Sequence, residues 1–574
     1  MGLLHLVQES PYTHSLISSL ISSPFLSLTC IVLFISIITR IITGVRSSIA
    51  QNNNDAASKT PNRIAYWLPW VGSALSFVRD IEGTISRDRD ISGDGIFSYR
   101  IGAGKYYVVN MPSLVQQVFA QRGNVLNKQR TLEWFMKTAF NDKFSTRDEH
   151  EAFHGHHNAL NLMLKEDFIN EATSKTARAV EIEAGKLVTS APWLYPDQEG
   201  KALELWEEAG KVKFNTDGTF EANFYALIVN YMGQIVIDML WGKALIQNHP
   251  NLQQDMWDFD EGVHHIITKF LANVTAAGRR AVAARERLTI AMREWHLAVA
   301  AKQAGRLPGA QWGALEDISE VMQDRVKVWV STHASETLQK TNDVSVLWGV
   351  NVNSNKNIFW MLMQIYTRSA LLSDIREEIA PYVRVSPAGE RGSDGYPKLS
   401  IDVDGLMKHC FLLKAAFYET MRMNMSGLGI REVLKDVVLK ESPTDAALFG
   451  KKKAQAYTIP AGSTLVLANG TMQMDQRIFA NPEQFYPERF IEEGPDGKPR
   501  VTMRNLHTFG GGLYKCKGRY FAEKEVMIFA SSLLVMWDVE SVNGEELKVP
   551  KMGYAGASRS PLEDVRVRLT RRYN

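Results

Sequence analysis

The chain has 574 residues, 45% of them apolar, which is enough to bury a large core as one big domain or several small ones. Lys and Arg number 65 against 63 Asp and Glu, and this balance excludes a strong whole-protein field that would attract nucleic acid. The three cysteines, Cys30, Cys410 and Cys516, are too few and too scattered for a disulfide framework or a zinc cluster. We therefore expect a reduced, cytosolic body with no nucleic-acid partner.

A long apolar segment near the N-terminus predicts a membrane anchor. Residues 16–42 carry one charge, Arg40, and a bilayer core needs roughly 20 apolar residues. No Lys or Arg precedes the segment, whereas Arg46, Lys59 and Arg63 follow it. The positive-inside rule then places the N-terminus in the lumen and the body in the cytosol. A cleaved signal peptide is the alternative, but its basic first region is missing.

The segment between anchor and body is polar. Residues 51–58 contain asparagines, an aspartate and small residues with little capacity to pack. We expect three parts: an anchor over 1–46, a polar linker over 47–60 and a catalytic body over 61–574.

The body shows a mainly helical pattern with short strands. Residues 95–110 alternate β-branched and aromatic side chains around two glycines, which predicts a hairpin. Apolar residues spaced three and four apart predict helices over 220–241, 281–303 and 318–329. Further strand pairs are expected over 456–467 and 548–569. The predicted fold class is therefore mainly α with small β-sheets.

Two segments in the second half carry charged or polar residues at helical spacing. Asparagines at 351, 353, 355 and 357 follow Gly349, and such side chains can simply hydrogen-bond within a helix. Farther on, Glu419 and Arg422 lie three apart on a helical run and can form an ion pair. An exposed pair of this kind contributes only tenths of a kcal/mol.

A glycine-rich stretch with one cysteine, residues 509–522, is the strongest motif. Its glycines let the backbone pass close to a flat object, and we expect Gly518 to allow a tight turn into a helix beginning near Arg519. Converging N–H groups and the positive end of that helix are expected to lower the pKa of Cys516 and favour its thiolate. A buried free cysteine beside a turn is the alternative.

The spacing from Phe509 through Gly512, Cys516 and Gly518 to Ala522 resembles the heme-thiolate signature of the cytochrome P-450 family. The resemblance covers the chain from about residue 60 and implies the family's α-rich fold, with heme b bound through the thiolate of Cys516, the metal ligand. It also implies that Phe509 and Gly512 lie against the cofactor.

Other positions match the same family. Glu419 and Arg422 resemble its E-x-x-R motif, and residues 485–490 resemble its P-E-R-F motif. The resemblance implies a buried structural network of Glu419, Arg422 and Arg489, and it implies that Arg431 reaches a heme propionate. A solvated arginine at the end of a strand is the alternative for Arg431.

Residues 347–360 occupy the place of the family's distal helix but lack its acid–threonine pair. If Gly349 is the small residue pressed on the heme, Val352 and Asn353 replace the pair, and a shift by one residue gives Asn353 and Ser354 instead. We therefore name Asn353 and Ser354 as candidate catalytic residues. The pattern resembles the branch containing cholesterol 7α-hydroxylase and prostacyclin synthase, so asparagine here does not decide the reaction.

The resemblance implies a monooxygenase that oxidises a lipophilic terpenoid, steroid, polyketide or alkaloid intermediate with dioxygen. Electrons from NADPH would arrive through a membrane-bound reductase, with cytochrome b5 as a further donor, at a basic face around Lys515, Lys517 and Arg519. The anchor implies the endoplasmic reticulum membrane, and the long loops are similar to those of fungal biosynthetic members. A reductase-independent heme-thiolate isomerase or dehydratase and a non-catalytic heme-binding protein are the alternatives.

Overall fold

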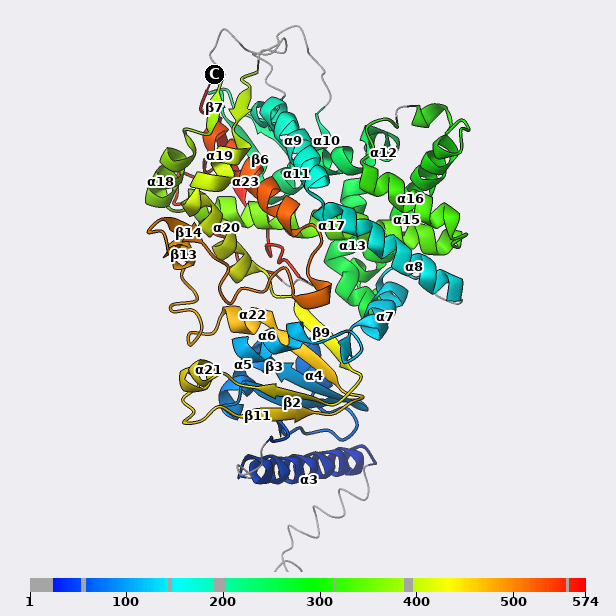
Figure 1. Ribbon diagram of the computed structural model, residues 1–574, viewed down its shortest axis with the longest axis vertical. Helices are drawn as coiled ribbons and strands as arrows, with labels where there is room; N and C mark the ends of the chain where they lie inside the picture. Colours follow the sequence, from blue (N-terminus) through cyan, green and yellow to red (C-terminus); the bar gives the residue numbers. More distant parts are fainter. Residues whose placement is uncertain are drawn as a thin grey trace, which may run out of the picture. The chain divides into compact units, whose positions relative to one another are not determined.

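The computed structural model describes residues 24–52, 58–142, 147–189, 203–313, 315–386, 396–553 and 557–573. The chain divides into two compact units, the first made of Met1–Lys128 and Leu428–Ile478, the second of Gln129–Gly427 and Phe479–Asn574. Figure 1 labels the helices and strands of both. Helices predominate and the sheets are small, which confirms the predicted fold class.

The first unit is built around a six-stranded sheet with strand order β1-β2-β3-β12-β9-β4. The predicted hairpin forms: β2 and β3 pair antiparallel and turn at Gly102, whose φ of 56° favours glycine. A second, two-stranded sheet pairs β10 with β11. The elements of this unit are α3 (Pro24–Asn52), β1 (Asn62–Arg63), α4 (Ala74–Arg79), α5 (Ile81–Ser92), β2 (Ile96–Ile101), β3 (Gly104–Val109), α6 (Pro112–Ala120), β4 (Leu126–Asn127), β9 (Leu428–Val433), β10 (Val437–Lys440), α21 (Pro443–Leu448), β11 (Ala456–Ile459), β12 (Thr464–Ala468) and α22 (Asn469–Gln473).

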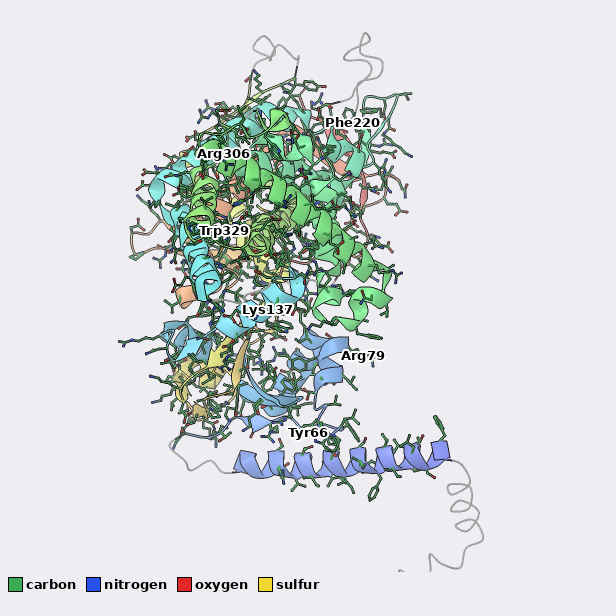
Figure 2. The ribbon with its side chains drawn as sticks, turned by 90° about the vertical axis from the view of Figure 1, so that its right-hand side faces the viewer. Tyr66, Arg79, Lys137, Phe220, Arg306 and Trp329 are labelled. Carbon is green, nitrogen blue, oxygen red and sulfur yellow. The ribbon has the colours of Figure 1, made fainter. Side chains whose placement is uncertain are left out.

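Helix α3 is apolar and open to its surroundings. Within it, Ser27–Ser48 is long and apolar enough to cross a membrane and is 6% buried. Its side chains project from the helix in Figure 2. Near its C-terminal half, Arg40 donates to the carbonyl of Ala65, and Thr43 Oγ1 donates to the carbonyl of Tyr66 at 3.2 Å. The helix continues past residue 46 to Asn52, and residues 53–57 of the expected linker lie outside the described residues.

The second unit is mostly helical. The helix expected from residue 220 begins at Phe224, because Phe220–Asn223 pairs as strand β6. Its helices are α7 (Gln129–Ala139), α8 (Arg147–Ala159), η1 (Leu160–Leu164), α9 (Glu166–Glu183), η2 (Ala184–Lys186), α10 (Leu205–Ala209), α11 (Phe224–Trp241), α12 (Lys243–Asn248), α13 (Leu252–Ile267), α14 (Phe270–Val274), α15 (Ala276–Gln303), η3 (Ala310–Trp312), α16 (Glu320–Ser331), α17 (Glu336–Tyr366), α18 (Ser369–Ile379), α19 (Val403–His409), α20 (Phe411–Asn424), η5 (Pro487–Phe490), η6 (Gly512–Tyr514) and α23 (Arg519–Met536).

Short sheets complete the second unit. A four-stranded sheet has the order β15-β16-β6-β5, and two further pairs are β7 with β8 and β13 with β14. Of the strand pair expected over 548–569, residues 566–569 form the first part of β16, but β16 pairs with β15 and β6. Among the described residues before it, Met552 and Pro561 form only an isolated bridge, since proline offers no N–H to a ladder. The strands are β5 (Lys213–Phe214), β6 (Phe220–Asn223), β7 (Val383–Val385), β8 (Leu399–Ile401), β13 (Ile491–Glu493), β14 (Pro499–Val501), β15 (Trp537–Ser541) and β16 (Arg566–Arg571).

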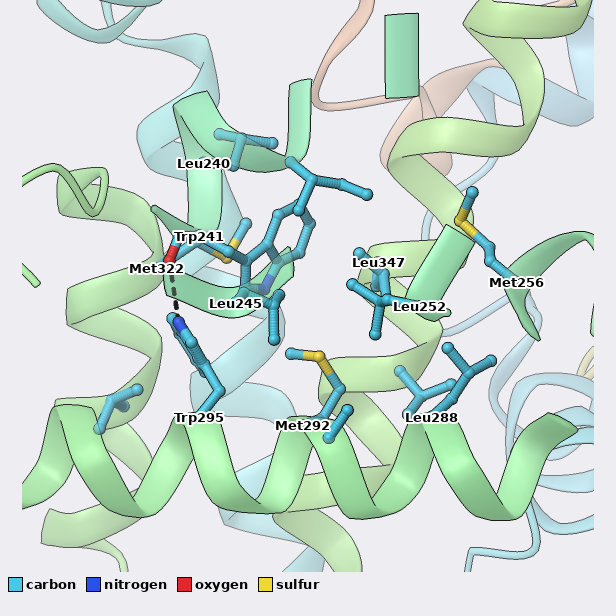
Figure 3. Close-up of a cluster of buried hydrophobic side chains, with 14 of the residues drawn as sticks. Leu240, Trp241, Leu245, Leu252, Met256, Leu288, Met292, Trp295, Met322 and Leu347 are labelled. Atoms are coloured by element: carbon cyan, nitrogen blue, oxygen red, sulfur yellow. Dashed lines mark hydrogen bonds between the residues drawn. The ribbon is translucent and has the colours of Figure 1, made fainter. Parts of the chain in front are cut away.

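Large apolar side chains fill the core of the second unit. Figure 3 shows Trp241 of α11 facing Trp295 of α15, and the indole Nε1 of Trp295 donates to the carbonyl of Trp241 at 2.9 Å. Leu347 of α17 belongs to the same buried cluster. Helix α11 is also long and apolar enough to cross a membrane. It is 78% buried, however, and serves as a core helix. This packing fixes the N-terminal half of α17, which precedes the candidate distal residues.

Candidate active site

The cysteine loop is closed by its own backbone. The amide of Cys516 donates to the carbonyl of Phe509 at 2.9 Å, and Arg519 donates back to the carbonyl of Cys516 at 2.8 Å. Gly510 and Gly512 have φ of 68° and 59°, a left-handed conformation that side chains rarely adopt. The loop therefore requires glycine at these two positions and presents Cys516 immediately before α23.

Cys516 is exposed. The protein atoms around it nevertheless favour the neutral thiol over the thiolate. Desolvation by the protein atoms around the thiol raises its pKa above the ordinary value. Hydrogen bonds from the amides of Gly518 and Arg519, and the charges of Arg519 and Lys517, lower the pKa but are outweighed. The expectation of a lowered pKa is thus wrong, although the donors expected to lower it are present.

Gly518 lies in the turn that leads into α23, and the helix begins at Arg519 as expected. Its φ of −82° is open to any residue, so the backbone conformation alone does not require glycine. A Cβ at this position would approach the methyl group of Met163 to 3.3 Å, which is a tight contact with a flexible side chain.

Glu419, Arg422 and Arg489 lie together in a buried network. Arg422 donates to both carboxylate oxygens of Glu419, at 2.7 and 2.8 Å, and neither side chain of this pair is exposed. Arg489 Nε donates to Glu419 Oε1 at 3.0 Å, and so does the backbone amide of Tyr486. The two arginines also donate to backbone carbonyls, those of Pro482 and Ala480. The carboxylate therefore joins α20 to the segment around η5.

A side-chain contact connects α20, the helix that carries Glu419 and Arg422, to the cysteine loop. Thr508, which precedes Phe509, donates its hydroxyl to the sulfur of Met421 at 3.4 Å. Met421 lies between Glu419 and Arg422 on α20. A displacement of Glu419 or Arg422 on α20 can therefore shift the start of the cysteine loop through the contact of Met421 with Thr508.

The middle of α17 has one open face. Most of the 31-residue helix is buried, but Val346, Gly349, Val350 and Asn353 retain accessible surface at a spacing of three and four residues. A Cβ built on Gly349 would meet no atom within 4 Å. The side-chain oxygen of Asn353 is buried and has no hydrogen-bond partner in the described part of the chain. Gly349 thus gives this face open space, whereas the side-chain oxygens of Asn351, Asn355 and Asn357 are buried without a partner in the described residues just as that of Asn353 is.

The neighbouring asparagines serve the helix or its packing. The side-chain amides of Asn351 and Asn357 donate to the carbonyls one turn back, at 2.9 and 2.8 Å. Asn355 donates instead to the carbonyl of Val229 on α11, at 3.3 Å. These contacts match the structural interpretation of Asn351 and Asn357, and they leave Asn353 as the asparagine on the open face.

Glu525 on α23 is a buried acid that the sequence motifs did not indicate. It is 3% exposed, and burial raises its pKa to about 8, with the hydroxyl of Ser354 on α17 as a weaker influence that lowers it. In the sequence Glu525 directly precedes the apolar residues 526–530, which was the available signal.

The buried Glu525 should make stability depend on pH. Its pKa rises from 4.5 in the unfolded chain to about 8 in the fold, so only the unfolded chain loses the proton between these values. Stability is then fully present below pH 4.5 and decreases as pH rises to about 8, by at most about 1.4 kcal/mol per pH unit. We expect Glu525→Gln to flatten this decline in denaturant unfolding across pH 5 to about 8.5; an unchanged slope would contradict the assignment.

Arg431 and the buried His156 have other surroundings. Arg431 belongs to the first unit, where it lies in β9 and donates to the carbonyl of Ile430 at 2.8 Å, and its role toward a propionate stays a prediction. His156, in the histidine cluster of α8, is completely buried with its ring centroid 4.0 Å from that of Trp329. Burial lowers its pKa well below the usual value, so it packs as a neutral ring.

Comparison with known proteins agrees with this geometry. Residues 344–563, which contain α17 from Val344 onward, the glutamate–arginine network and the cysteine loop, match the family model for cytochrome P450. This part of the chain is similar to proteins of the cytochrome P450 superfamily. The match covers the C-terminal part of the second unit together with strands β9 to β12 of the first.

Named relatives of this chain come from fungi and mammals. It is 24% identical over 344 residues to a cytochrome P450 monooxygenase of Gibberella zeae, an alignment that spans 59% of each chain. With the monooxygenase efuG of Hormonema carpetanum it shares 22% identity over 93% of this chain and 95% of the relative. Cytochrome P450 7B1 of Mus musculus is 23% identical over 84% of this chain and 85% of its own. The alignments with the Gibberella zeae protein and with nodJ of Hypoxylon pulicicidum span 59% and 54% of those two relatives.

The cytochrome P450 family binds heme through a cysteine thiolate, and the described residues of this chain fit that group. Cys516 is exposed on a loop whose glycines allow a close approach of a flat ring. On α17, open space lies beside Gly349. Among the described residues no cluster of three or more His, Cys, Asp and Glu could bind a metal ion.

Proposed function

We propose that this chain is a heme-thiolate monooxygenase that oxidises a lipophilic small molecule with dioxygen and electrons from a reductase. The exposed Cys516, presented by a loop closed through Phe509, is the observation that carries the proposal. The fungal relatives, which are named cytochrome P450 monooxygenases, support the same reaction class.

The residues have separate roles in this proposal. Bound as the family implies, heme with a cysteine thiolate supplies the redox chemistry that inserts one oxygen atom of dioxygen into the substrate. Cys516 provides the thiolate, and the carbonyl of Phe509 orients its loop. Gly349 leaves room on α17, and Asn353 lies one turn further along the same face of this helix.

An aromatic cluster supports a lipophilic substrate. Phe135 of α7 and Trp348 of α17 are partly buried, with ring centroids 6.2 Å apart, and Phe140 lies within 6.0 Å of Trp348. Trp348 directly precedes Gly349, and its indole Nε1 donates to Asp260 at 3.0 Å, so the ring is held in one orientation. Aromatic surface of this kind binds apolar ligands such as terpenoid, steroid or polyketide intermediates.

The electron donor would approach the cysteine side. Lys515 and Lys517 flank Cys516, and Arg519 follows on the first turn of α23. Leu513, which is 61% exposed, adds an apolar contact to this basic face. An acidic reductase surface, or that of cytochrome b5, complements such a face, and the association rate should fall with added salt.

The test is reconstitution of the full chain with heme, reductase and NADPH in detergent or lipid. We expect a carbon monoxide difference spectrum typical of thiolate ligation, together with NADPH-dependent incorporation of one atom of dioxygen into a lipophilic substrate. Absence of thiolate ligation would refute the cofactor assignment, and thiolate ligation without oxidation of any substrate would favour a non-catalytic heme-binding protein.

Asn353 favours a second candidate, a heme-thiolate isomerase or dehydratase. An amide replaces the alcohol that usually assists proton delivery in this family, and its oxygen is unpartnered in the described structure. Such an enzyme would convert a peroxide substrate without NADPH. Strict dependence on NADPH would exclude it.

We further propose that α3 anchors the catalytic body on the cytosolic face of the endoplasmic reticulum membrane. Its Ser27–Ser48 stretch is apolar and largely unburied, and the contacts from Arg40 and Thr43 to residues 65 and 66 connect it to the first unit. The boundaries of 1–46 for the anchor, 47–60 for the linker and 61–574 for the body remain part of this proposal.

Charges in the middle of α3 should release the protein from membranes. Ile35 and Ile38 are 43% and 38% exposed, and replacing both by lysine costs roughly 2.5 to 3.5 kcal/mol per residue in a spanning helix. We expect the double variant to move from the membrane pellet to the carbonate-soluble fraction, with its heme spectrum unchanged. The control Ser36→Ala should stay in the pellet, and retention of the lysine variant would contradict a spanning α3.

A further inference from the structure

A cavity of about 810 Å³ lies in the second unit beside α9, α10 and α11. Figure 1 labels these three helices, and α11 packs against both of the others. The cavity lining contains no residue of α17, α20 or α23, so the cavity is separate from the candidate active site. Its volume lies within the range of sites that bind small molecules.

One face of α11 lines this cavity. Ile235, Asp238 and Met239 lie four, seven and eight residues after Tyr231, which is the spacing of a single helix face. Ile235 and Met239 are each 8% exposed. The ring of Trp206 on α10 packs edge-on against the ring of Tyr231, with centroids 5.6 Å apart. The wall between Tyr231 and Asp238 is therefore apolar.

The hydroxyl of Tyr231 has unused hydrogen-bonding capacity. The residue is 1% exposed, and its hydroxyl has no hydrogen-bond partner among the described residues. Burial raises the pKa of Tyr231 well above its usual value, so the group is a neutral phenol that can both donate and accept. A buried polar group without a partner costs free energy, and a ligand that hydrogen-bonds to it removes this cost.

The carboxylate of Asp238 lies at the other end of the apolar wall. Gln234 Nε2 donates to it and lies 3.3 Å from each carboxylate oxygen, which leaves room for further donors. Burial raises the pKa of Asp238 to about 6, so the group is an anion above this pH. Seven residues of helix rise roughly 10 Å, which separates the backbone positions of Tyr231 and Asp238 along α11.

The charges around the cavity are mainly negative. Five carboxylates border it against three lysines, an excess of two negative charges. Lys175 and Glu316 each pair with a residue outside the lining, which leaves this excess unchanged. Such an excess attracts cations and matches two positive charges on a ligand. The carboxylates are those of Glu183, Glu204, Asp238, Glu316 and Asp317.

We propose that this cavity binds a protonated aliphatic diamine. One ammonium group hydrogen-bonds to the carboxylate of Asp238, and the other donates to the hydroxyl oxygen of Tyr231. The apolar chain between the two groups lies along Ile235. Two polar groups at the ends of an apolar wall and the excess of two negative charges define this ligand class. Binding here does not depend on the proposed function, because the cavity shares no residue with the candidate active site.

The experiment measures binding of octamethylenediamine to the purified full chain by titration calorimetry at about pH 7.5, where both amines are protonated. The extended chain of this diamine spans roughly the two helical turns between Tyr231 and Asp238. Trimethylenediamine carries the same charge but is too short to reach both groups, so it serves as the control ligand.

Two conservative variants each remove one contact. Asp238→Asn keeps the shape of the side chain and removes its charge, and Tyr231→Phe removes only the hydroxyl. The control variant is Asp258→Asn on α13. Asp258 accepts a hydrogen bond from Gln254 at 2.9 Å, one turn earlier on its helix, and does not line the cavity. It therefore reproduces the local hydrogen bonding of Asp238 at a different place.

We expect Asp238→Asn to weaken binding of octamethylenediamine about tenfold or more, and Tyr231→Phe to weaken it about threefold. Asp258→Asn should bind this diamine as the wild type does. Trimethylenediamine should bind the wild type about tenfold more weakly than the long diamine. Equal affinity of the wild type and Asp238→Asn would overturn the proposal, and so would equal affinity for the two diamines.

The heme spectrum separates this cavity from the candidate active site. An amine that ligates heme iron changes the visible absorption of the heme, and its affinity does not depend on Asp238. A diamine in the cavity leaves that absorption unchanged. Binding that changes the spectrum equally in all variants, with no further binding, would overturn the proposal. Absence of thiolate-ligated heme would refute the proposed function, whereas binding that requires Asp238 would still support the diamine site.

Discussion

Replacing Cys516 by serine is expected to abolish the thiolate type of carbon monoxide spectrum and all turnover. A serine hydroxyl stays protonated near neutral pH, so it cannot provide the anionic sulfur that the family's cofactor requires. The backbone bond from residue 516 to Phe509 remains possible, and the loop should keep its shape. Heme content and the difference spectrum of the purified variant measure the effect.

The matched control is Cys410→Ser. Cys410 is 1% exposed, and burial raises the pKa of its thiol to about 12, so it behaves as a packed neutral group. Its replacement should leave the spectrum unchanged. A normal spectrum in Cys516→Ser, or its loss in Cys410→Ser alone, would refute the assignment of the ligand.

Replacing Glu419 by alanine is expected to destabilise the fold by about 3 to 5 kcal/mol, because it leaves Arg422 buried without its carboxylate partner. The amide of Tyr486 and the Nε of Arg489 lose their acceptor as well. Denaturant unfolding measures the change. We also expect reduced heme retention, since Thr508 at the start of the cysteine loop bonds to Met421 on the same helix.

Glu171→Ala provides the comparison for this network. Glu171 pairs with Lys175 at 2.7 Å on the exposed surface of α9, where such pairs contribute 1 kcal/mol or less. Its replacement should change stability little. Similar losses in the two variants would show that Glu419 acts only as an ordinary surface charge.

The sequence was most informative where a motif fixes the backbone. The glycines before Cys516 and the spacing of Glu419 and Arg422 predicted a loop and an ion pair, and both are present. The hairpin over 95–110 was predictable because alternation and glycine spacing are local signals.

Contacts between distant segments were not predictable from one sequence. Nothing in the spacing of Ser354 and Glu525 indicates that their helices meet, since the pair is separated by many intervening elements. The pKa of Cys516 was mispredicted for a related reason: the loop showed the donors that lower it, whereas desolvation depends on the packing of the whole unit.

The packing of Met163 against Gly518 bears on the contact between η1 and the start of α23. A Cβ at residue 518 would approach the methyl group of Met163 to 3.3 Å, and the thioether is unbranched and rotates easily. This contact can therefore adjust by rotation of one side chain.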